Sequence, residues 1–274
     1  MQHTFDTPTK IELYVELGKG RLAVTAADTT QTRVDVVGKD AEDVVVEHRG
    51  DQVTVIAPRS QTGFLTGREP SYEVTVTMPE HGTLTSKTGS ADVVVAGPLA
   101  SAWLTTGSGD LQVELVESAC EIQSGSGDIQ VTDVRGDGRI KSGSGDIRID
   151  SAGGALAVST GSGDVQVRNV AGRLAVKTGS GDVQVGESSD DVAFSTGSGD
   201  LQVGLARRGS FVIKGASGDV RIGVPSGTPV WTDISTVTGR IRSDLEPVGA
   251  PAEGQDHLEI RAKTASGDIT LQQR

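Results

Sequence analysis

The chain has 274 residues, of which 23% are charged and 3% aromatic, with a formal net charge of −12 and a pI near 4.8. This acidity and the absence of a Lys/Arg cluster argue against nucleic acid and anionic lipid as partners, because phosphate binding needs concentrated positive charge. No segment approaches the roughly 20 apolar residues of a membrane span, and no export leader is recognisable at the start, so we expect no membrane insertion and a cytoplasmic protein.

The first part of the chain has strand patterns without a clear repeat. Alternating apolar residues predict strands at 11–15, 21–24, 33–37, 43–46, 52–56 and 72–76. Residues 59–71 read as a long loop, and because such loops are often functional, Phe64 and Leu65 within it are candidates for an interaction surface. We expect residues 1–83 to form irregular first rungs, or a small sandwich, that cap a repeat structure.

From residue 84 to 224 one repeat dominates, and its clearest copy is Thr-Gly-Ser-Gly-Asp-Val-Gln-Val at 160–167. Successive copies follow every 18 residues, and the last regular one after 19. The aspartates that mark the copies are Asp92, Asp110, Asp128, Asp146, Asp164, Asp182, Asp200 and Asp219. A short fixed period without a helical pattern is typical of a solenoid in which each repeat is one coil.

Equivalent residues of successive coils should stack about 4.8 Å apart in a parallel sheet. The positions one and three after the aspartate, and six and eight before it, are mostly Val, Ile and Leu, and they alternate with polar positions as buried columns should. Between two of these columns an outward stripe contains Gln166, Gln184 and Gln202, which are candidates for an interaction surface. The glycines at the Gly-Ser-Gly corner are expected to supply positive φ.

These patterns predict an all-β protein: a parallel β-helix, or β-solenoid, with 18-residue coils and an irregular β cap at the N terminus. We expect a right-handed coil, because crossovers within one sheet are right-handed in about 98% of cases.

Residues 225–274 depart from the repeat, with an aberrant rung after Pro225 and a Pro/Gly-rich excursion at 245–254. The last strands, at 258–262 and 268–271, are expected to close the final coil. The open edge of the sheet would then lie at residues 269–271, and an unprotected edge invites another strand. We interpret 1–83, 84–224 and 225–274 as parts of one continuous domain.

The stacked aspartates have two interpretations. Carboxylates about 4.8 Å apart repel by roughly 0.9 kcal/mol even in bulk water, so the ladder needs compensation. Calcium could supply it, as in β-rolls, through Asp110, Asp128, Asp146, Asp164, Asp182 and Asp200. The alternative is that each carboxylate caps its corner by bonding to turn amides. We prefer capping, since the other half of each coil has no second aspartate, and we therefore expect no metal and no cofactor.

Catalysis is not expected. The four histidines lie outside the regular rungs without metal-ligand or Ser-His-Asp spacing, and the few aromatic residues argue against a polysaccharide-cleaving β-helix. Cys120, the only cysteine, falls in a buried column and is interpreted as a core residue. Trp103 falls in an outward column and is either a contact residue or covered by a neighbouring loop.

The Thr-Gly-Ser-Gly-Asp-Val-x-Val repeat, with Phe5, Asp6, Thr7 and Pro8 before it and an early strand at 20–28, resembles a bacterial putative-adhesin family of unknown function, related to autotransporter-adhesin-head domains. The resemblance covers essentially the whole chain and implies a β-solenoid from a prokaryote, without catalytic residues. We therefore expect a non-catalytic structural or adhesin-like scaffold that binds a protein partner or itself. The alternatives are a calcium-binding β-roll and, third, a carbohydrate-active enzyme.

Overall fold

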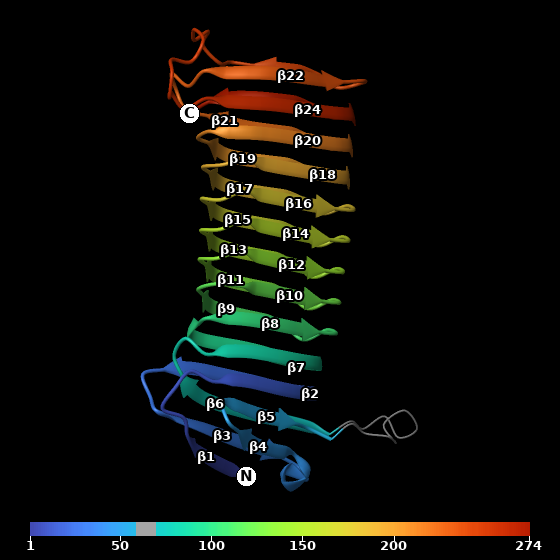
Figure 1. The fold of residues 1–274 in the computed structure, drawn as a ribbon. Coiled ribbons are helices and arrows are strands. Elements are labelled where there is room, and N and C mark those ends of the chain that lie inside the picture. Colours follow the sequence, from blue (N-terminus) through green and yellow to red (C-terminus); the bar gives the residue numbers. More distant parts are fainter. Residues whose placement is uncertain (59–69) are drawn as a thin grey trace. The chain divides into compact units, whose positions relative to one another are not determined.

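The structure, a computed structural model, describes residues 1–58 and 70–274, and their secondary structure is almost entirely β-strand (Figure 1). They form two compact units, Met1–Gly136 and Asp137–Arg274. The predicted parallel β-solenoid is confirmed in both units. The boundary between the units falls inside the regular repeat, and the single continuous domain stays a prediction, as does the hand of the coil. In the described residues no helix is long and apolar enough to cross a membrane.

The first unit contains the strands β1 to β11. They are β1 (Gln2–Asp6), β2 (Glu12–Ala27), β3 (Gln31–Gly38), β4 (Val45–Arg49), β5 (Gln52–Ile56), β6 (Ser71–Pro79), β7 (Thr83–Leu99), β8 (Ser101–Thr106), β9 (Leu111–Val116), β10 (Cys120–Ser124) and β11 (Ile129–Val134), with a 3-10 turn at Ala41–Asp43. β8 pairs in parallel with β10, and β9 with β11, so that each residue faces the one 18 positions later. The predicted apolar columns are buried here.

The strand β2 does not follow chain order within the first unit. It pairs in parallel with β5 and β6 and also with β7, so a strand from the start of the chain lies between later ones. β3 runs antiparallel to β6 and β1, and β4 antiparallel to β5. The residues before the regular repeat therefore form irregular first rungs that antiparallel strands extend.

The second unit contains the strands β12 to β25. They are β12 (Gly138–Ser142), β13 (Ile147–Ala152), β14 (Leu156–Thr160), β15 (Val165–Val170), β16 (Leu174–Thr178), β17 (Val183–Ser188), β18 (Val192–Ser198), β19 (Leu201–Ala206), β20 (Gly209–Ser217), β21 (Val220–Val224), β22 (Val230–Thr236), β23 (Ile241–Ser243), β24 (Leu258–Ser266) and β25 (Ile269–Gln273). Parallel pairs such as β15 with β17 stack Val165 on Val183 and Gln166 on Gln184. The predicted columns are again buried, and a further buried column includes Ala152, Val170 and Ala206.

The final strands of the second unit also depart from chain order. β24 lies between β20 and β22, and β25 lies between β21 and β23. The expectation that residues 269–271 form the open edge was wrong, because Ile269 is paired on both sides and fully buried. The terminal rung is β22–β23 instead.

The composition of the two rungs explains this order. The inward positions of β24 and β25 include Leu258, Ile260, Ala262, Ile269 and Leu271, which are all buried. The residues stacked on them in the terminal rung include Thr232 and Ser243. The more apolar rung therefore lies inside the stack, where it is covered on both sides.

Candidate functional site

The repeated aspartates bond the backbone of the next coil. Asp164 Oδ1 accepts a hydrogen bond from the backbone N–H of Asp182 at 2.9 Å, and Asp182 Oδ1 accepts one from Asp200 at 2.8 Å. The same bond, at 2.7–3.0 Å, is made by Asp92, Asp110, Asp146, Asp200 and Asp219. Hydrogen bonds of this kind stabilise the charged carboxylate. The corner capping favoured by the sequence analysis is therefore present in the structure.

A calcium site in the ladder would need the oxygens of the aspartate carboxylates as metal ligands. The ion takes about six to eight oxygen ligands. In residues 1–58 and 70–274 no three His, Cys, Asp or Glu side chains are grouped as a metal site. Arg148 contacts Asp146 at 3.2 Å, and Arg221 contacts Asp219 at 2.8 Å, so guanidinium groups supply part of the positive charge in the ladder. We assign the aspartates to the corners.

A buried hydroxyl column, which the sequence analysis missed, lies four residues before the aspartates of the regular coils, from Thr88 to Thr178. Thr160 Oγ1 accepts a hydrogen bond from Gly163 N at 3.0 Å, and Ser142 Oγ donates one to Gly145 O at 2.9 Å. A Cβ built on Gly163 would lie 2.1 Å from Gly145 O, so close packing rather than positive φ requires this glycine. The signal was visible in the sequence, because Thr or Ser opens nearly every copy of the repeat.

Gln166, Gln184 and Gln202 point outward and stack on one another in the second unit, as predicted. Two shallow hollows flank this column. One of about 170 Å³ is lined on its far side by Asp146, Asp164 and Asp182, and one of about 150 Å³ by Arg168, Gly186 and Gly204. Hollows this small suit the side chains of a partner, whereas small-molecule sites are larger.

Trp103 lies on β8 of the first unit and is 41% exposed, so among the described residues it is not covered by a loop. The glutamine column belongs to the second unit and to the other strand of the coil. The structure therefore does not bring Trp103 and the glutamines into one site. Phe64 and Leu65 lie outside the described residues. An interaction role for any of these residues stays a prediction.

Cys120 and His81 are the side chains most relevant to catalysis. Cys120 is buried in β10, and loss of solvation raises the pKa of its thiol to about 12. A thiol held neutral is a poor nucleophile. His81 Nδ1 lies 2.6 Å from Glu117 Oε2, and Arg135 lies 3.8 Å from the same carboxylate. The carboxylate of Glu117 thus joins His81 to Arg135 as a surface cluster.

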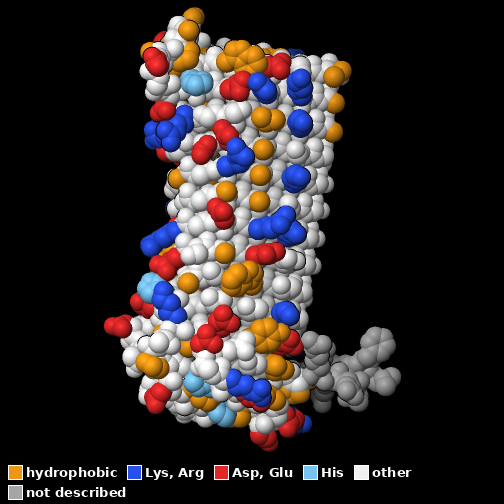
Figure 2. Space-filling model, viewed as in Figure 1, with side chains coloured by type: hydrophobic (Ala, Val, Ile, Leu, Met, Phe, Trp, Pro, Cys, Tyr) orange, Lys and Arg blue, Asp and Glu red, His pale blue; other side chains and the backbone are white. Residues whose placement is uncertain are grey.

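The terminal rung β22–β23 exposes large apolar side chains. Trp231 and Ile241 on these strands are 52% and 49% exposed, and Val237 and Val248 in the loops beside them are 81% and 44% exposed. Together they are half of the large apolar side chains that are exposed in the described residues. Ile241 stacks on buried Ile269, so it occupies a core column that no further coil of the described chain covers. Figure 2 shows hydrophobic side chains gathered over β22 and the loops beside it. The sequence analysis missed this surface because it placed the open edge on the last strand.

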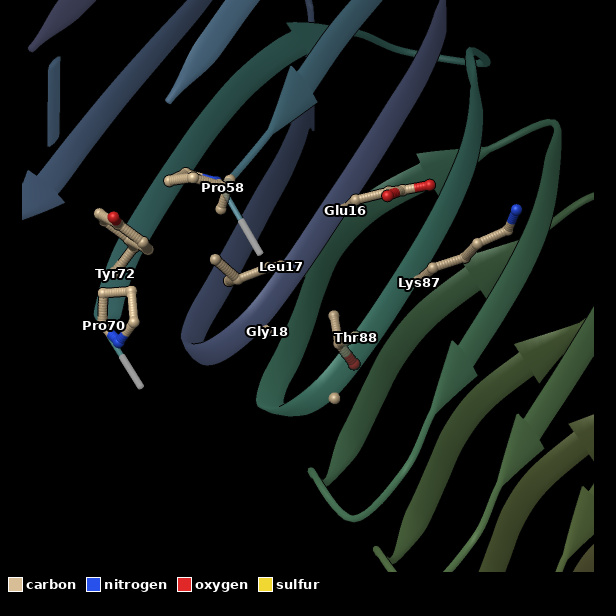
Figure 3. Close-up of a pocket in the computed structure, with 10 residues that line it drawn as sticks. Glu16, Leu17, Gly18, Pro58, Pro70, Tyr72, Lys87 and Thr88 are labelled. Atoms are coloured by element: carbon tan, nitrogen blue, oxygen red, sulfur yellow. The ribbon is translucent and has the colours of Figure 1, made fainter. Parts of the chain in front are cut away.

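A cavity of about 380 Å³ lies in the first unit beside Pro58 and Pro70 (Figure 3). Burial, followed by the negative charges of Asp43, Asp40 and Glu42, raises the pKa of Tyr72 in its wall. The hydroxyl of Thr88, also in the wall, is buried without a hydrogen-bond partner in the described part of the chain. We assign this cavity no ligand.

Comparison with known proteins identifies a family across nearly the whole chain. The family model called Toastrack DUF4097 matches residues 9–272. A search of curated proteins finds no match.

Solved structures show similar chains. A putative adhesin from Bacteroides fragilis is 12% identical, with a TM-score of 0.41, over 99% of this chain and 96% of that one. A putative lipid binding protein from Parabacteroides distasonis is 13% identical, with a TM-score of 0.45, over 98% and 96%. A putative cell adhesion protein from Clostridium sporogenes is 10% identical, with a TM-score of 0.24, over 100% and 99%. Likenesses at this level carry no argument about function.

Proposed function

The chain belongs to the Toastrack DUF4097 family, and we propose that it is a non-catalytic binding module that associates through the terminal rung β22–β23, in the first place with a second copy of itself. The observation that carries the proposal is a strand edge at which a core-column residue, Ile241, and a neighbouring outward residue, Trp231, are both exposed. The repeated polar groups support a non-catalytic role, since the Asp carboxylates and the Thr/Ser hydroxyls bond the corners of the coils.

The backbone of β22 offers free hydrogen-bonding groups along its outer side. Leu258 N donates to Pro229 O at 3.0 Å, and Val237 N donates to Thr264 O at 3.3 Å. Because ladder bonds alternate along a strand, the N–H groups of Thr232 and Ile234 point away from β24. Among the described strands β24 is the one that pairs with β22. Such an edge is a template for another strand.

The energetics favour weak association. Full burial of one large apolar side chain contributes about 1.5–3 kcal/mol. The four exposed side chains of the rung and its loops are already about half buried, so covering the rest of them would contribute roughly 3–7 kcal/mol, whereas joining two molecules costs roughly 4–15 kcal/mol. The opposing terms are similar in size, so we expect association that depends on concentration rather than an obligate dimer.

Sedimentation velocity across a concentration range tests this proposal. The intact chain should sediment faster as its concentration rises. Thr232→Pro removes an outward N–H, and Ile241→Asp places a charge in the exposed core column, so both variants should remain monomeric while their melting temperatures change little. Gln184→Asp on the lateral face is the matched control and should associate like the intact chain.

A monomeric intact chain at every concentration would overturn the proposal. Association that persists in both edge variants but is lost in Gln184→Asp would also overturn it and assign the contact to the glutamine column.

A further inference from the structure

Tyr14 and Trp103 lie far apart in the sequence but two strands apart on one outer face of the first unit. Thr85 on β7 is paired with Trp103 on β8 and with Tyr14 on β2. Neighbouring strands are about 4.8 Å apart, so the two aromatic residues start about 9.6 Å apart along a straight column. The insertion of β2 beside β7 creates this arrangement.

Polar side chains surround the two aromatic residues. The Tyr14 hydroxyl donates to Glu16 Oε1, and the Lys87 ammonium lies 5.5 Å from the centre of the Tyr14 ring. Figure 3 shows Glu16 and Lys87 side by side on neighbouring strands. Glu121 on β10 is paired with Trp103 on β8, and its Oε1 accepts a hydrogen bond from Gln123 Nε2 at 3.0 Å. The Tyr14 ring is thus held by contacts at its hydroxyl and over its ring, within a polar border.

We propose that Tyr14 and Trp103 form a stacking platform for an extended β-1,4-linked glycan chain. One face of a pyranose ring consists of C–H groups, which pack against the electron-rich face of an aromatic ring. An extended β-1,4-linked chain turns over at each sugar, so every second ring presents the same face. Two aromatic residues at twice the strand spacing engage sugars n and n+2, with the sugar between them above Thr85. Hydroxyl groups at the sugar edges then meet Glu16 and Lys87.

The geometry favours a glycan over a protein partner. The centre of a protein interface is a continuous, desolvated apolar patch. Here polar Thr85 separates the two aromatic residues, and Glu16 and Lys87 border them. Glu16 and Lys87 also line the cavity of about 380 Å³ described above. Tyr14 and Trp103 lie outside its lining, on an outer face that suits a polymer better than a single sugar. The inference rests on the proposed binding function and names a ligand class for it, but it uses a surface in the other unit.

Intrinsic fluorescence provides a direct test, because Trp103 and Trp231 are the only two tryptophans. In a Trp231→Phe background, Trp103 alone reports binding. The probes are cellohexaose and the hexamer of β-1,4-linked N-acetylglucosamine, which separate a plain glucan from an amino-sugar polymer, with α-1,4-linked maltohexaose as control. We expect a saturable change in Trp103 emission with at least one β-1,4-linked hexamer and at least about tenfold weaker binding of maltohexaose.

Calorimetry on variants locates the site. Trp103→Ala and Tyr14→Ala should each weaken binding at least about tenfold, and Tyr14→Phe, which keeps the ring, should weaken it less. Gln184→Ala in the second unit is the matched control and should bind like the intact chain. Circular dichroism confirms that each variant is folded, as expected for substitutions on an outer face.

Absence of saturable binding to both β-1,4-linked hexamers would overturn the inference, as would equal affinity of the folded Trp103→Ala variant or of maltohexaose. Sedimentation of the intact chain, which keeps Trp231, together with calorimetry on the same samples separates the two proposals. Glycan binding by a strictly monomeric protein would overturn only the association through β22–β23, whereas association without glycan binding would overturn only the platform.

Discussion

At the scale of single residues, position in the coil decides what each side chain does. Val183 and Gln184 are neighbours on β17, yet Val183 is 1% exposed and Gln184 points to solvent. The alternation repeats in every regular coil, because successive residues of a strand point to opposite faces. The same substitution should therefore change the free energy of unfolding much more at a buried position than at the exposed position next to it in the sequence.

Val183→Asp and Gln184→Asp test this register. Val183→Asp buries a carboxylate without a partner and should lower the free energy of unfolding by about 4 kcal/mol or more. Gln184→Asp adds the same group at the surface and should change it by less than about 1 kcal/mol. Thermal unfolding followed by circular dichroism measures both. Similar losses in the two variants would contradict the register.

The buried columns were predictable because apolar residues recur every 18 positions. The hydroxyl column was not recognised, since Thr and Ser at a corner suit solvent as well as they suit a buried bond to a glycine. Only the geometry of Thr160 with Gly163 shows which applies. The positive φ expected of the corner glycines is found at Gly199, Gly218 and Gly267. At Gly163 close contact with the neighbouring backbone requires the glycine instead, and sequence alone cannot separate the two reasons.

At the scale of strands, the formation of short parallel β-strands was predictable from the sequence. The order in which these strands pair in the sheet was not. The periodicity of the sequence indicates which strands form one coil, but it does not indicate between which other coils that coil lies. β2 and β24 both lie between strands that do not neighbour them in the sequence. For β24 and β25 the apolar columns decide the order, because Leu258, Ile260 and Leu271 gain most from cover on both sides.

Two proline substitutions test the strand order. Thr270 lies on β25, which has a partner strand on each side, so Thr270→Pro leaves a buried carbonyl without its donor. It should lower the free energy of unfolding by about 1–3 kcal/mol. Thr232→Pro on the outer side of β22 should have a much smaller effect. Urea unfolding measures the difference, and a larger loss for Thr232→Pro would show that β22 is not the terminal strand.

At the scale of the molecule, negative charge is distributed unevenly. The first unit has 10 Lys and Arg against 20 Asp and Glu, and the second has 15 against 17. The second unit, which contains the terminal rung, is therefore close to neutral, and charge repulsion opposes its association only weakly. The aspartate ladder adds a separate question, which is whether a cation contributes to stability.

Calcium titration answers that question. A calcium site in the native ladder would add about 2.7 kcal/mol at a concentration 100 times its Kd, which raises the melting temperature by several degrees. We expect little change on adding calcium or a chelator, because amide hydrogen bonds and arginines already compensate the ladder. Magnesium at the same concentration controls for screening of the net charge. A rise with calcium alone would restore the β-roll interpretation.

The interleaved strands at the start and at the end of the chain have a consequence for how the protein is made. The ribosome completes β2 well before β6 and β7, and completes β22 and β23 before β24 and β25. In each case a strand reaches its final neighbours only after later residues have been synthesised, and such long-range pairings are slow to form. Folding during synthesis should therefore begin in the regular coils, whose partners are 18 residues apart, and the two irregular regions should be the last to lock into place.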